Sequence, residues 1–537
     1  MSFAAAPQKR EQMVVFSHRL DDSLPKDHLV RLFDDILGRL EWKTWEASYH
    51  GQLGQPPIHP RVLAGTILYG LLTKIRSSRG LEDAVRVRLD FLWLVEGHSI
   101  DHSTFSKFRK KHAEPLKQLF VQIGLLARQL GWLPLETLAY DGTRLKSNNR
   151  RSGTRTPQEL REMKQELEQK FQELSAQADQ EDARDQEVFG SGTGRSLPED
   201  LGSTKRRLQE VDRVLEELER IEEAGETIPT RIPLTDPQSR LTPNKEGGFA
   251  PNYTPLATVD ASSGLIVATD VIAMTNDESQ LVAQVKQVQE NFQLPAPPRD
   301  VLGDGSMGTG PNLAALEDLD VTLYSPLPGK KWPENPALRD DLTQPVPPEL
   351  WDKLPTRTVH PTGGQKQPQL DKEAFVYDAQ EDCYWCPQGE KLARAHTSQH
   401  QQQGQVVERT CYKAPLAVCR ECPLRKLCLQ ETATKPQVNG RQVSRDEFDA
   451  QRQRLKERMA TPEAQAKYSH RREVAERPFA TIKQQFGARQ FLLRGLANVR
   501  LEWQWLATAF NLHRLMSLIR ARPGPVPSVL LSAPHPV

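Results

Sequence analysis

Apolar residues recur at helical spacing through residues 27–130. The stretch "DHLVRLFDDILGRL" shows this spacing clearly, and "HPRVLAGTILYGLLTKI" is a more buried helix with Pro60 near its start. In "IDHSTFSKFRKKH" we expect Ser103 to cap a short helix whose last turns are basic. The pattern predicts a helical N-terminal domain over residues 1–130. Its basic helix fits either a DNA groove or an ordinary packing role, and the residues favour neither.

Between residues 131 and 330 the pattern becomes that of alternating strands and helices. "PLETLAYD" predicts a strand ending at Asp141, "YTPLATVDA" and "LIVATDVIAM" predict a hairpin that turns at residues 262–264, and "DVLGD" predicts a strand ending near Asp304. Helices are expected from "DESQLVAQVKQVQENF" and "PNLAALEDL". We therefore predict a mixed α+β or α/β layer. Residues 156–226 interrupt it with two polar helical stretches, which predict an inserted helical hairpin with a structural or self-association role.

The remainder of the chain divides into three segments. Residues 331–447 form a second insertion that contains the cysteines, and residues 328–380 are expected to be irregular. Residues 448–521 are again helical and end in "LANVRLEWQWLATAFNLHRLMSLI". The Pro-rich residues 522–537 are expected to be a disordered tail.

Composition and charge narrow the class of protein. The 537 residues are 37% hydrophobic and 26% charged, as in soluble globular proteins, and no apolar run approaches a membrane span or a signal peptide. A cytoplasmic location is the expectation. The net charge of +1 points to no partner, but residues 141–155 and 470–494 are both rich in Arg and Lys. If the fold joins these two stretches they can form one anion-binding face; otherwise each is a solvated surface.

All six cysteines fall between Cys383 and Cys428. Without a secretion signal, such clustering favours metal binding over disulfides, and four thiolates suit a structural Zn²⁺. Two sets of four ligands are possible. One contains Cys383, Cys386, Cys419 and Cys422, and the other replaces Cys383 with Cys428. An iron–sulfur cluster and metal-free thiols remain alternatives.

Two predicted strands end in an acid that is followed at once by glycine. Asp141 and Asp304 would both be left accessible by these glycines, and acids at neighbouring strand ends can share divalent metal ions. The alternative is a pair of ordinary turn aspartates. Asp260 and Asp277 also follow apolar runs and are interpreted as a turn residue and a helix cap, or as supporting groups of the site.

The segment "YSHRREVAERPFATIKQQFG" carries a polar stripe at helical spacing. Its members lie three or four residues apart, which places them on one face of a helix. They are Tyr468, Arg472, Glu476, Phe479 and Lys483. A carboxylate flanked by Arg and Lys suits a site for metal and phosphate, whereas a run of intrahelical ion pairs such as Arg472–Glu476 is the alternative. Pro478 is expected to kink or break this helix near Glu476.

Taken together, these motifs resemble the Asp-Asp-Glu transposases of bacterial insertion sequences. They are "AYDGTRLKSN", "LGDGSMG" and "YSHRREVAERPFATIKQQFG", the last resembling the Tyr-Arg-Glu-Lys signature of one transposase group. "HPRVLAGTILYGLLTKIRSSRGLEDAV", "DHSTFSKFRKKH", "CRECPLRKLC" and "NLHRL" are similar to the eleven-eighty-two insertion-sequence family. The likeness runs from about residue 15 to about residue 520. The signature usually has two residues between Tyr and Arg; Arg472 leaves three, and Arg471 restores the gap but changes the distance to Glu.

The resemblance implies a ribonuclease-H-like catalytic core and hydrolysis of DNA strands at transposon ends, followed by transfer of the freed 3′-OH to target DNA. It implies that two Mg²⁺ ions, for which Mn²⁺ can substitute, are held by Asp141, Asp304 and Glu476. Arg472, Lys483 and Tyr468 would contact DNA, and Cys386, Cys419, Cys422 and Cys428 become the preferred Zn²⁺ set.

Other partners and roles follow from the composition, the basic stretches and this likeness together. Basic residues expected at DNA are Arg144, Lys146, Lys107, Arg109 and Lys110. A homodimer on paired transposon ends, a bacterial nucleoid-associated location and no membrane partner are expected. The alternatives are an inactive, domesticated DNA-binding protein and a metal-dependent nuclease without strand transfer.

Overall fold

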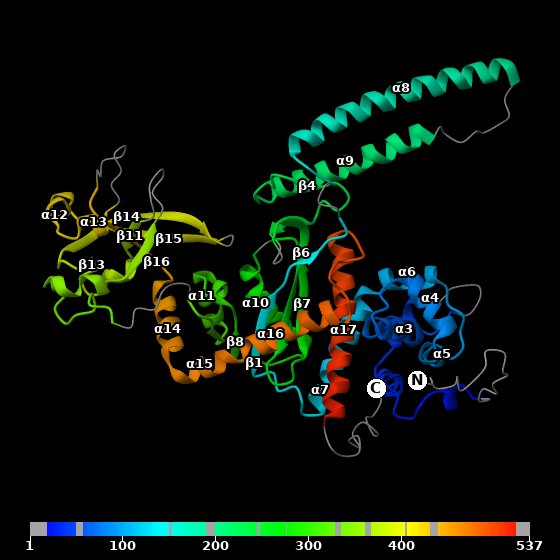
Figure 1. Cartoon of the computed structure of the whole chain (residues 1–537), viewed down its shortest axis with the longest axis horizontal. Coiled ribbons are helices and arrows are strands. Elements are labelled where there is room, and N and C mark those ends of the chain that lie inside the picture. Colours follow the sequence, from blue (N-terminus) through cyan, green and yellow to red (C-terminus); the bar gives the residue numbers. More distant parts are fainter. Residues whose placement is uncertain are drawn as a thin grey trace, which may run out of the picture. The chain divides into compact units, whose positions relative to one another are not determined.

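The computed structural model describes residues 19–49, 57–149, 153–189, 199–243, 247–274, 276–327, 334–359, 367–402, 405–429 and 439–521. The predicted disordered tail, 522–537, lies outside these residues. The chain forms two compact units, one made of residues 1–302 and 469–537 and the other of residues 303–468. Figure 1 traces the elements of both. No helix of the described residues is long and apolar enough to cross a membrane. The mixed α+β class is confirmed, whereas the boundaries predicted at 130, 330, 447 and 521 remain predictions.

A mixed sheet forms the centre of the first unit. β1 (Thr137–Gly142) pairs antiparallel with β6 (Phe249–Asp260) and parallel with β8 (Asp300–Leu302), and β6 also pairs antiparallel with β7 (Ile266–Ile272). Two short strands, β2 (Leu145–Lys146) and β5 (Arg240–Pro243), extend the outer part of β6. The predicted β6–β7 hairpin is confirmed, with Gly264 at a positive φ of 71° in its turn. β6 is buried along almost its whole length, as expected for a strand covered on both faces.

Helices cover both faces of this sheet. On one face, Thr258 of β6 donates to Gln284 of α10 (Leu281–Asn291) at 3.2 Å. On the other, Trp503 of α17 (Leu496–Arg520) donates from Nε1 to Thr269 of β7 at 2.5 Å. Asn511 of α17 accepts from the Ile266 N–H at 2.9 Å and donates to the Ile266 carbonyl at 2.7 Å. α17 is therefore hydrogen-bonded to the backbone of β7 as well as packed on it. Figure 1 shows α17 running beside β7.

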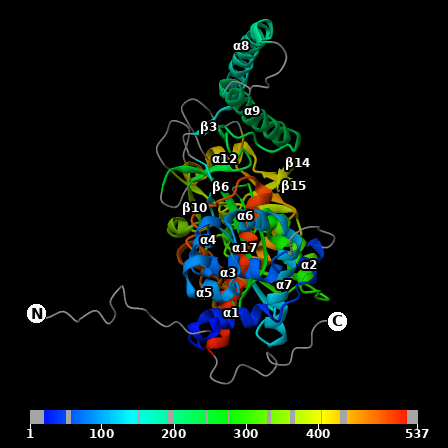
Figure 2. The same cartoon turned by 90° about the vertical axis from the view of Figure 1, so that its right-hand side faces the viewer.

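The N-terminal residues form the predicted set of helices, which packs on α17 (Figure 2). These elements are η1 (Leu20–Ser23), α1 (Leu29–Leu37), α2 (Lys43–Glu46), η2 (Ala47–Tyr49), α3 (Pro60–Leu72), α4 (Ser78–Val87), α5 (Leu89–Leu94), α6 (His102–Lys111) and α7 (Ala113–Gln129). The expectation that Ser103 caps α6 is wrong. Asp101 is the cap, because its carboxylate accepts the Thr104 N–H at 2.8 Å.

The predicted helical hairpin is confirmed as α8 (Pro157–Phe189) and α9 (Glu199–Glu223), which lie side by side (Figure 1). Its apolar seam is narrow and contains Leu160, Val211, Val214 and Ile221. β3 (Thr154–Arg155) and β4 (Ile232–Pro233) pair where the hairpin leaves and rejoins the unit. In residues 157–180 and 199–223, the exposed positions of the two helices are mostly polar, as the sequence pattern predicts.

The second unit contains a helical part and a sheet. Its helical part comprises η5 (Gly305–Met307), α11 (Gly310–Asp318), the strand β9 (Thr322–Tyr324), α14 (Asp449–Ala460) and α15 (Pro462–Ser469). The sheet has the order β12 (Val376–Asp378), β13 (Cys383–Trp385), β14 (Lys391–Gln402), β15 (Gln405–Lys413) and β16 (Gln442–Asp446). Around it lie η6 (Pro348–Lys353), β10 (Thr356–Val359), β11 (Gln367–Leu370), η7 (Lys372–Ala374), α12 (Leu416–Glu421) and α13 (Arg425–Cys428).

The expectation that residues 328–380 are wholly irregular is therefore wrong. The short strands in this segment are packed by single buried residues such as Leu370 and Phe375. Because prolines and charged residues surround them, these strands show no alternating apolar pattern in the sequence. These residues join Tyr384, Leu392 and Tyr412 in the core of the second unit.

The contact between α17 and β7 predicts a large cost for Asn511→Leu. The substitution removes both buried hydrogen bonds between this side chain and the Ile266 backbone, so the free energy of unfolding should fall by about 2–4 kcal/mol. Urea unfolding followed by tryptophan fluorescence measures this change. Asn498→Leu, on an exposed turn of the same helix, is the matched control and should change stability by less than about 0.5 kcal/mol. Equal effects of the two variants would contradict this role of Asn511.

Candidate active site and cysteine cluster

Asp141 lies on β1 and faces the side of the sheet that α17 covers. It is paired in register with Ala257, which is paired in turn with Thr269, the residue that Trp503 contacts. Paired residues point to the same face, so Asp141 shares the α17 face. The strand continues to Gly142, one residue beyond the predicted end.

A guanidinium meets the Asp141 carboxylate on this face. Nη2 of Arg471, in the first turn of α16 (Arg471–Ala480), lies 3.2 Å from Oδ1 of Asp141. Both side chains are largely buried, with exposed fractions of 11% for Arg471 and 18% for Asp141. The ion pair holds the start of α16 against β1, and α16 also contacts β6.

Asp277 is neither the helix cap nor the supporting group of the Asp141 site that the sequence suggested. It precedes η4 (Glu278–Gln280), but its side chain makes no capping hydrogen bond there. Its Oδ2 would lie 2.3 Å from a Cβ added at Gly142, and its carbonyl accepts from the Tyr140 hydroxyl at 2.8 Å. Tyr140 and Gly142 face away from Asp141 along the strand. Asp277 therefore lies on the α10 side and does not share the face of Asp141.

Asp260 is a structural turn residue, as predicted. Its buried carboxylate accepts from the Leu135 N–H at 3.1 Å, the Ser263 N–H at 2.7 Å and the Ser263 hydroxyl at 2.8 Å. Burial raises the pKa of this carboxyl group above its usual range, opposed by these hydrogen bonds. With all its acceptors engaged at the far end of β6, Asp260 is not a supporting group of the Asp141 site.

Glu476 lies at the middle of α16 and is open to solvent. Its side chain is 51% exposed and pairs with the 87% exposed Arg472 at 3.7 Å. The predicted break at Pro478 does not occur, because α16 runs through Pro478 to Ala480 and passes into the π-helical turn η8 (Thr481–Gln485). A wider turn after a missing N–H accommodates the proline without ending the helix.

The five-membered polar stripe is only partly realised. Tyr468 belongs to α15 in the second unit, since the helix is interrupted at His470. Phe479 is buried and stacks on Trp503 with ring centroids 6.0 Å apart, so it faces α17. Arg472, Glu476 and Lys483 remain as the polar members on the first unit.

Of the two alternatives for the basic stretches, the fold meets the condition of the first, because it brings them together. Lys483 donates from Nζ to Thr143 Oγ1 at 2.6 Å and to the Arg144 carbonyl at 3.1 Å. Residues 487–494, here named the connector, run beside β2: the Phe491 N–H donates to the Lys146 carbonyl at 2.9 Å. Arg494 donates to the Asn148 carbonyl at 3.0 Å.

Exposed cations line this junction. Arg144, Lys146, Arg489 and Arg494 are all exposed. Among the residues that the structure describes, none of the four pairs with a carboxylate. Arg76 holds the backbone of the connector in place. It donates to the carbonyls of Gly487 and Gln490 and pairs with Glu502 at 2.8 Å. The result is a fixed, positively charged surface, which suits a polyanion.

The basic helix α6 is only partly available for such a partner. Lys107 and Lys110 are exposed, as the DNA-groove interpretation requires. Arg109 is not: its guanidinium donates to the Arg76 carbonyl, and its Nε and Nη2 are buried without hydrogen-bond partners. Burial lowers the pKa of Arg109 to about 10. The charge of Glu502 opposes this shift, and the charge of the nearby Arg76 adds to it. Its assignment as a DNA contact is therefore wrong, because the side chain points to the helix's packed side.

Asp304 lies two residues beyond β8, at the start of the second unit. Its Oδ1 accepts from the Ser306 N–H at 2.8 Å and from the Ser306 hydroxyl at 2.5 Å, so it caps η5. The flanking glycines do not leave open space. A Cβ at Gly303 would meet Met307 at 2.7 Å, and one at Gly305 would meet the Pro326 carbonyl at 3.1 Å. These glycines allow close packing beside a half-buried carboxylate.

The structure groups Cys386, Cys419, Cys422 and Cys428 against one part of the second unit's core. Cys386 Sγ accepts from the Gln388 N–H at 3.3 Å and the Glu390 N–H at 3.4 Å, in a turn that Gly389 closes at a φ of 78°. Burial raises the pKa of Cys386 above its usual range, and these backbone donors oppose the rise. Burial raises the pKa of Cys428 to about 12, with Cys419, Cys386 and Cys422 near enough to add to the rise. The metal-free thiol is therefore protonated at neutral pH, and metal binding would release its proton.

Cys383 has other neighbours. Among the described residues, the group whose ligand atoms all lie within 4.8 Å of one another is Asp378, Glu381 and Cys383. Protein donors already engage these acids: Asp378 accepts the Gln380 N–H at 2.9 Å, and Glu381 pairs with Lys391 at 2.6 Å. The sulfur atoms of the four cysteines do not all lie within 4.8 Å of one another. Their side chains would therefore have to rotate toward a common point to bind one ion. On donor chemistry we still favour the four thiols over the acidic group for Zn²⁺.

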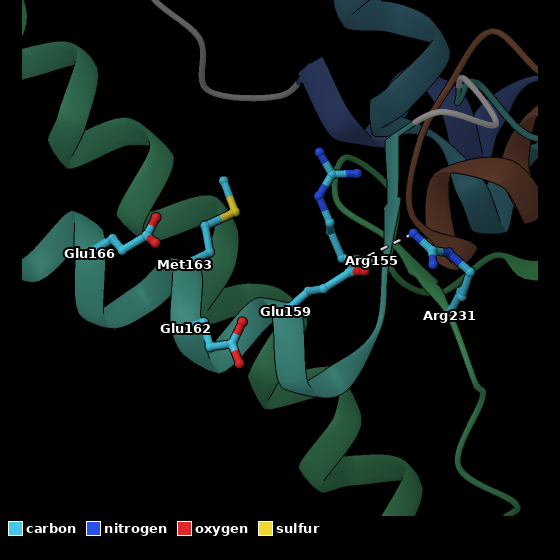
Figure 3. A pocket seen from close by; sticks show the side chains of 6 residues that line it. All are labelled: Arg155, Glu159, Glu162, Met163, Glu166 and Arg231. Atoms are coloured by element: carbon cyan, nitrogen blue, oxygen red, sulfur yellow. Dashed lines mark hydrogen bonds and ion pairs between the residues drawn. The ribbon is translucent and has the colours of Figure 1, made fainter.

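A shallow pocket at the base of the helical hairpin lies apart from these acids. Figure 3 shows its lining of Arg155, Glu159, Glu162, Met163, Glu166 and Arg231, with Arg231 paired to Glu159 at 3.4 Å. Its three acids outnumber its two cations by one, so the lining carries only a small net charge. The pocket therefore offers no strongly charged site for a ligand.

Comparison with known protein families gives two matches. Residues 18–111 match the family described as a transposase domain (DUF772), and residues 385–516 match the transposase DDE domain. The first covers the helices from α1 to α6, and the second covers the four grouped cysteines, α16 and most of α17. Asp141 and Asp304 lie outside both matched ranges. No curated protein gave a match.

The grouping of the cysteines predicts which substitution removes zinc. Cys428→Ser should lower the zinc content of the purified protein from about one ion per chain to near zero, because three thiolates hold zinc far less tightly than four. Elemental analysis by mass spectrometry measures this content. Cys383→Ser is the matched control and should retain the metal. The opposite result would instead select the set that contains Cys383.

Proposed function

Since the matched domains make this chain a DDE transposase of the bacterial insertion-sequence type, we propose that Asp141, Asp304 and Glu476 are its catalytic carboxylates. The observation that carries this proposal is the packing of α16, which bears Glu476, against β1, which bears Asp141. Both elements lie in one unit. The mixed sheet, with Asp141 on its central strand, supports the further inference of a ribonuclease-H-like core.

Asp304 is included on chain connectivity. β8 is parallel to β1, with Leu302 in register with Ala139. Asp304 follows Leu302 by two residues, as Asp141 follows Ala139. Carboxyl ends of parallel neighbouring strands meet at the same edge of a sheet, which is where open α/β sheets bind ligands.

The donor chemistry fits divalent metal ions. Asp141, Asp304 and Glu476 would hold Mg²⁺, with Mn²⁺ as a substitute, and the bound metal would polarise the phosphate and stabilise charge on the attacking and leaving oxygens. A water molecule would add to the phosphorus at the transposon end, the bond to the 3′ oxygen would break, and this oxygen would take up a proton to leave a 3′-OH. The same 3′-OH would then attack a target phosphodiester.

This chain's own cations would hold the DNA. Arg144, Lys146 and Lys483, together with the connector's Arg489 and Arg494, form a fixed basic surface beyond the end of β1. Lys107 and Lys110 on α6 are exposed for a second contact, whereas Arg472 would reach phosphate only by leaving Glu476. Tyr468 remains a proposed DNA contact from the second unit. A homodimer would bring two transposon ends together.

Substitution of the carboxylates tests the catalytic assignment. Asp141→Asn, Asp304→Asn and Glu476→Gln should each lower the rate of cleavage of transposon-end DNA by more than about 100-fold. Loss of a residue that only hydrogen-bonds to a metal ligand already lowers metal affinity or activity by about 10–100-fold, and loss of the ligand itself should lower it further. A gel assay with Mg²⁺ and labelled DNA follows cleavage and joining. Glu473→Gln, an exposed acid on the same helix paired with Arg477, should stay within about twofold of the parent. A parent that cleaves but never joins would be a nuclease, and full activity of Asp304→Asn would remove it from the triad.

Salt dependence tests the basic surface. Replacing Lys146 and Arg494 by alanine should weaken DNA binding and reduce the slope of log K against log salt by about 2, one for each lost phosphate contact. Fluorescence anisotropy at several salt concentrations gives the slope. The matched control replaces Lys286 and Arg299, exposed cations away from this surface, and should leave the slope unchanged. An unchanged slope in the first variant would exclude the connector from DNA binding.

A further inference from the structure

Arg471 occupies an unusual place for a cation. It shares the buried stripe of α16 with Ala475 and Pro478, the side of the helix that faces the sheet. A charge on a core-facing stripe needs a partner, because burying an unpaired ion is costly. Asp141 is that partner, at 3.2 Å.

The pairing leaves Arg471 incompletely satisfied. Its Nε is buried and has no hydrogen-bond partner in the described structure. The other arginines of this helix differ: Arg472 is 87% exposed, and Arg477 pairs with the exposed Glu473. Arg471 is therefore the α16 arginine that couples to a proposed metal ligand on the central strand.

The same carboxylate cannot serve a guanidinium and a metal ion equally well. Mg²⁺ demands close octahedral coordination, and a second cation held against the same oxygen repels it. We propose that Arg471 is a displaceable counter-ion of Asp141: it neutralises the carboxylate in the metal-free protein and must move aside before a divalent ion binds. This proposal rests on the proposed function, because it takes Asp141 as a metal ligand.

The displaced guanidinium needs a new anion. Its planar donors suit phosphate, and phosphodiester groups accompany the substrate into a transposase site. Arrival of DNA would then favour the displaced position of Arg471 and so favour metal binding. By linkage, metal and DNA would each tighten the binding of the other.

Metal affinity measures the competition without any need for catalysis. Mn²⁺ binding to the full-length protein is followed by calorimetry for the parent, Arg471→Gln and the control Arg477→Gln, which removes the same charge from the same helix. If the ion pair is closed for about nine-tenths of the time, only about a tenth of the parent is competent, and Arg471→Gln should bind Mn²⁺ about tenfold more tightly. Arg477→Gln should match the parent within about twofold.

The possible results distinguish failure of the Arg471 proposal from failure of the proposed metal site. Unchanged or weaker Mn²⁺ binding in Arg471→Gln, with a far-ultraviolet circular dichroism spectrum like that of the parent, would make Arg471 a purely structural partner and overturn the proposal. Arg471→Lys provides a second variant if the glutamine variant does not fold, and it should bind Mn²⁺ as weakly as the parent. If instead Asp141→Asn binds Mn²⁺ as well as the parent, the proposed metal site itself fails.

The coupling to DNA provides a second measurement. A duplex carrying the transposon end, added at saturating concentration, should tighten Mn²⁺ binding by a larger factor in the parent than in Arg471→Gln. The parent has an ion pair to open, and the variant has none. Equal factors in the two proteins would overturn the role of Arg471 in this coupling.

Discussion

The ion pair between Arg471 and Asp141 joins the two elements from which the candidate active site is built. Asp141 stands on the central strand, on the face that α17 covers, and Arg471 begins the helix that carries Glu476. Because the pair is largely buried, it fixes where α16 starts on the sheet. Phe479 stacked on Trp503 then sets the direction of the helix, which leaves Glu476 open to solvent.

The basic surface depends on the same packing. Lys483 lies in the π-helical turn after α16 and reaches the backbone just beyond β1, and the connector that follows is held by Arg76 and Glu502. Arg76 lies in the loop between α3 and α4, so a segment more than 400 residues away in the chain stabilises the connector. Cations on a held backbone keep their spacing, which favours a regular polyanion such as duplex DNA.

Buried and exposed residues are neighbours within the same motifs. In "NLHRL", Asn511 binds the backbone of β7, and Arg514 donates to the Ser263 carbonyl at 2.7 Å in the β6–β7 turn. In "YSHRRE", Arg471 is buried while Arg472 is exposed. A motif that resembles a family signature therefore contains structural members as well as members able to meet a substrate, and burial separates the two.

Local patterns were enough to predict most of the elements, since helical spacing, strand alternation and turn residues act within a few residues of one another. They predicted the mixed sheet, the helical hairpin and the final long helix, and they placed Asp141 on a strand and Glu476 on a helix. They could not predict which arginine faces Asp141, that Arg109 is buried, or that Asp277 lies on the opposite face of the sheet. Those outcomes depend on strand register and on contacts between segments hundreds of residues apart, and these are decided only when the chain packs.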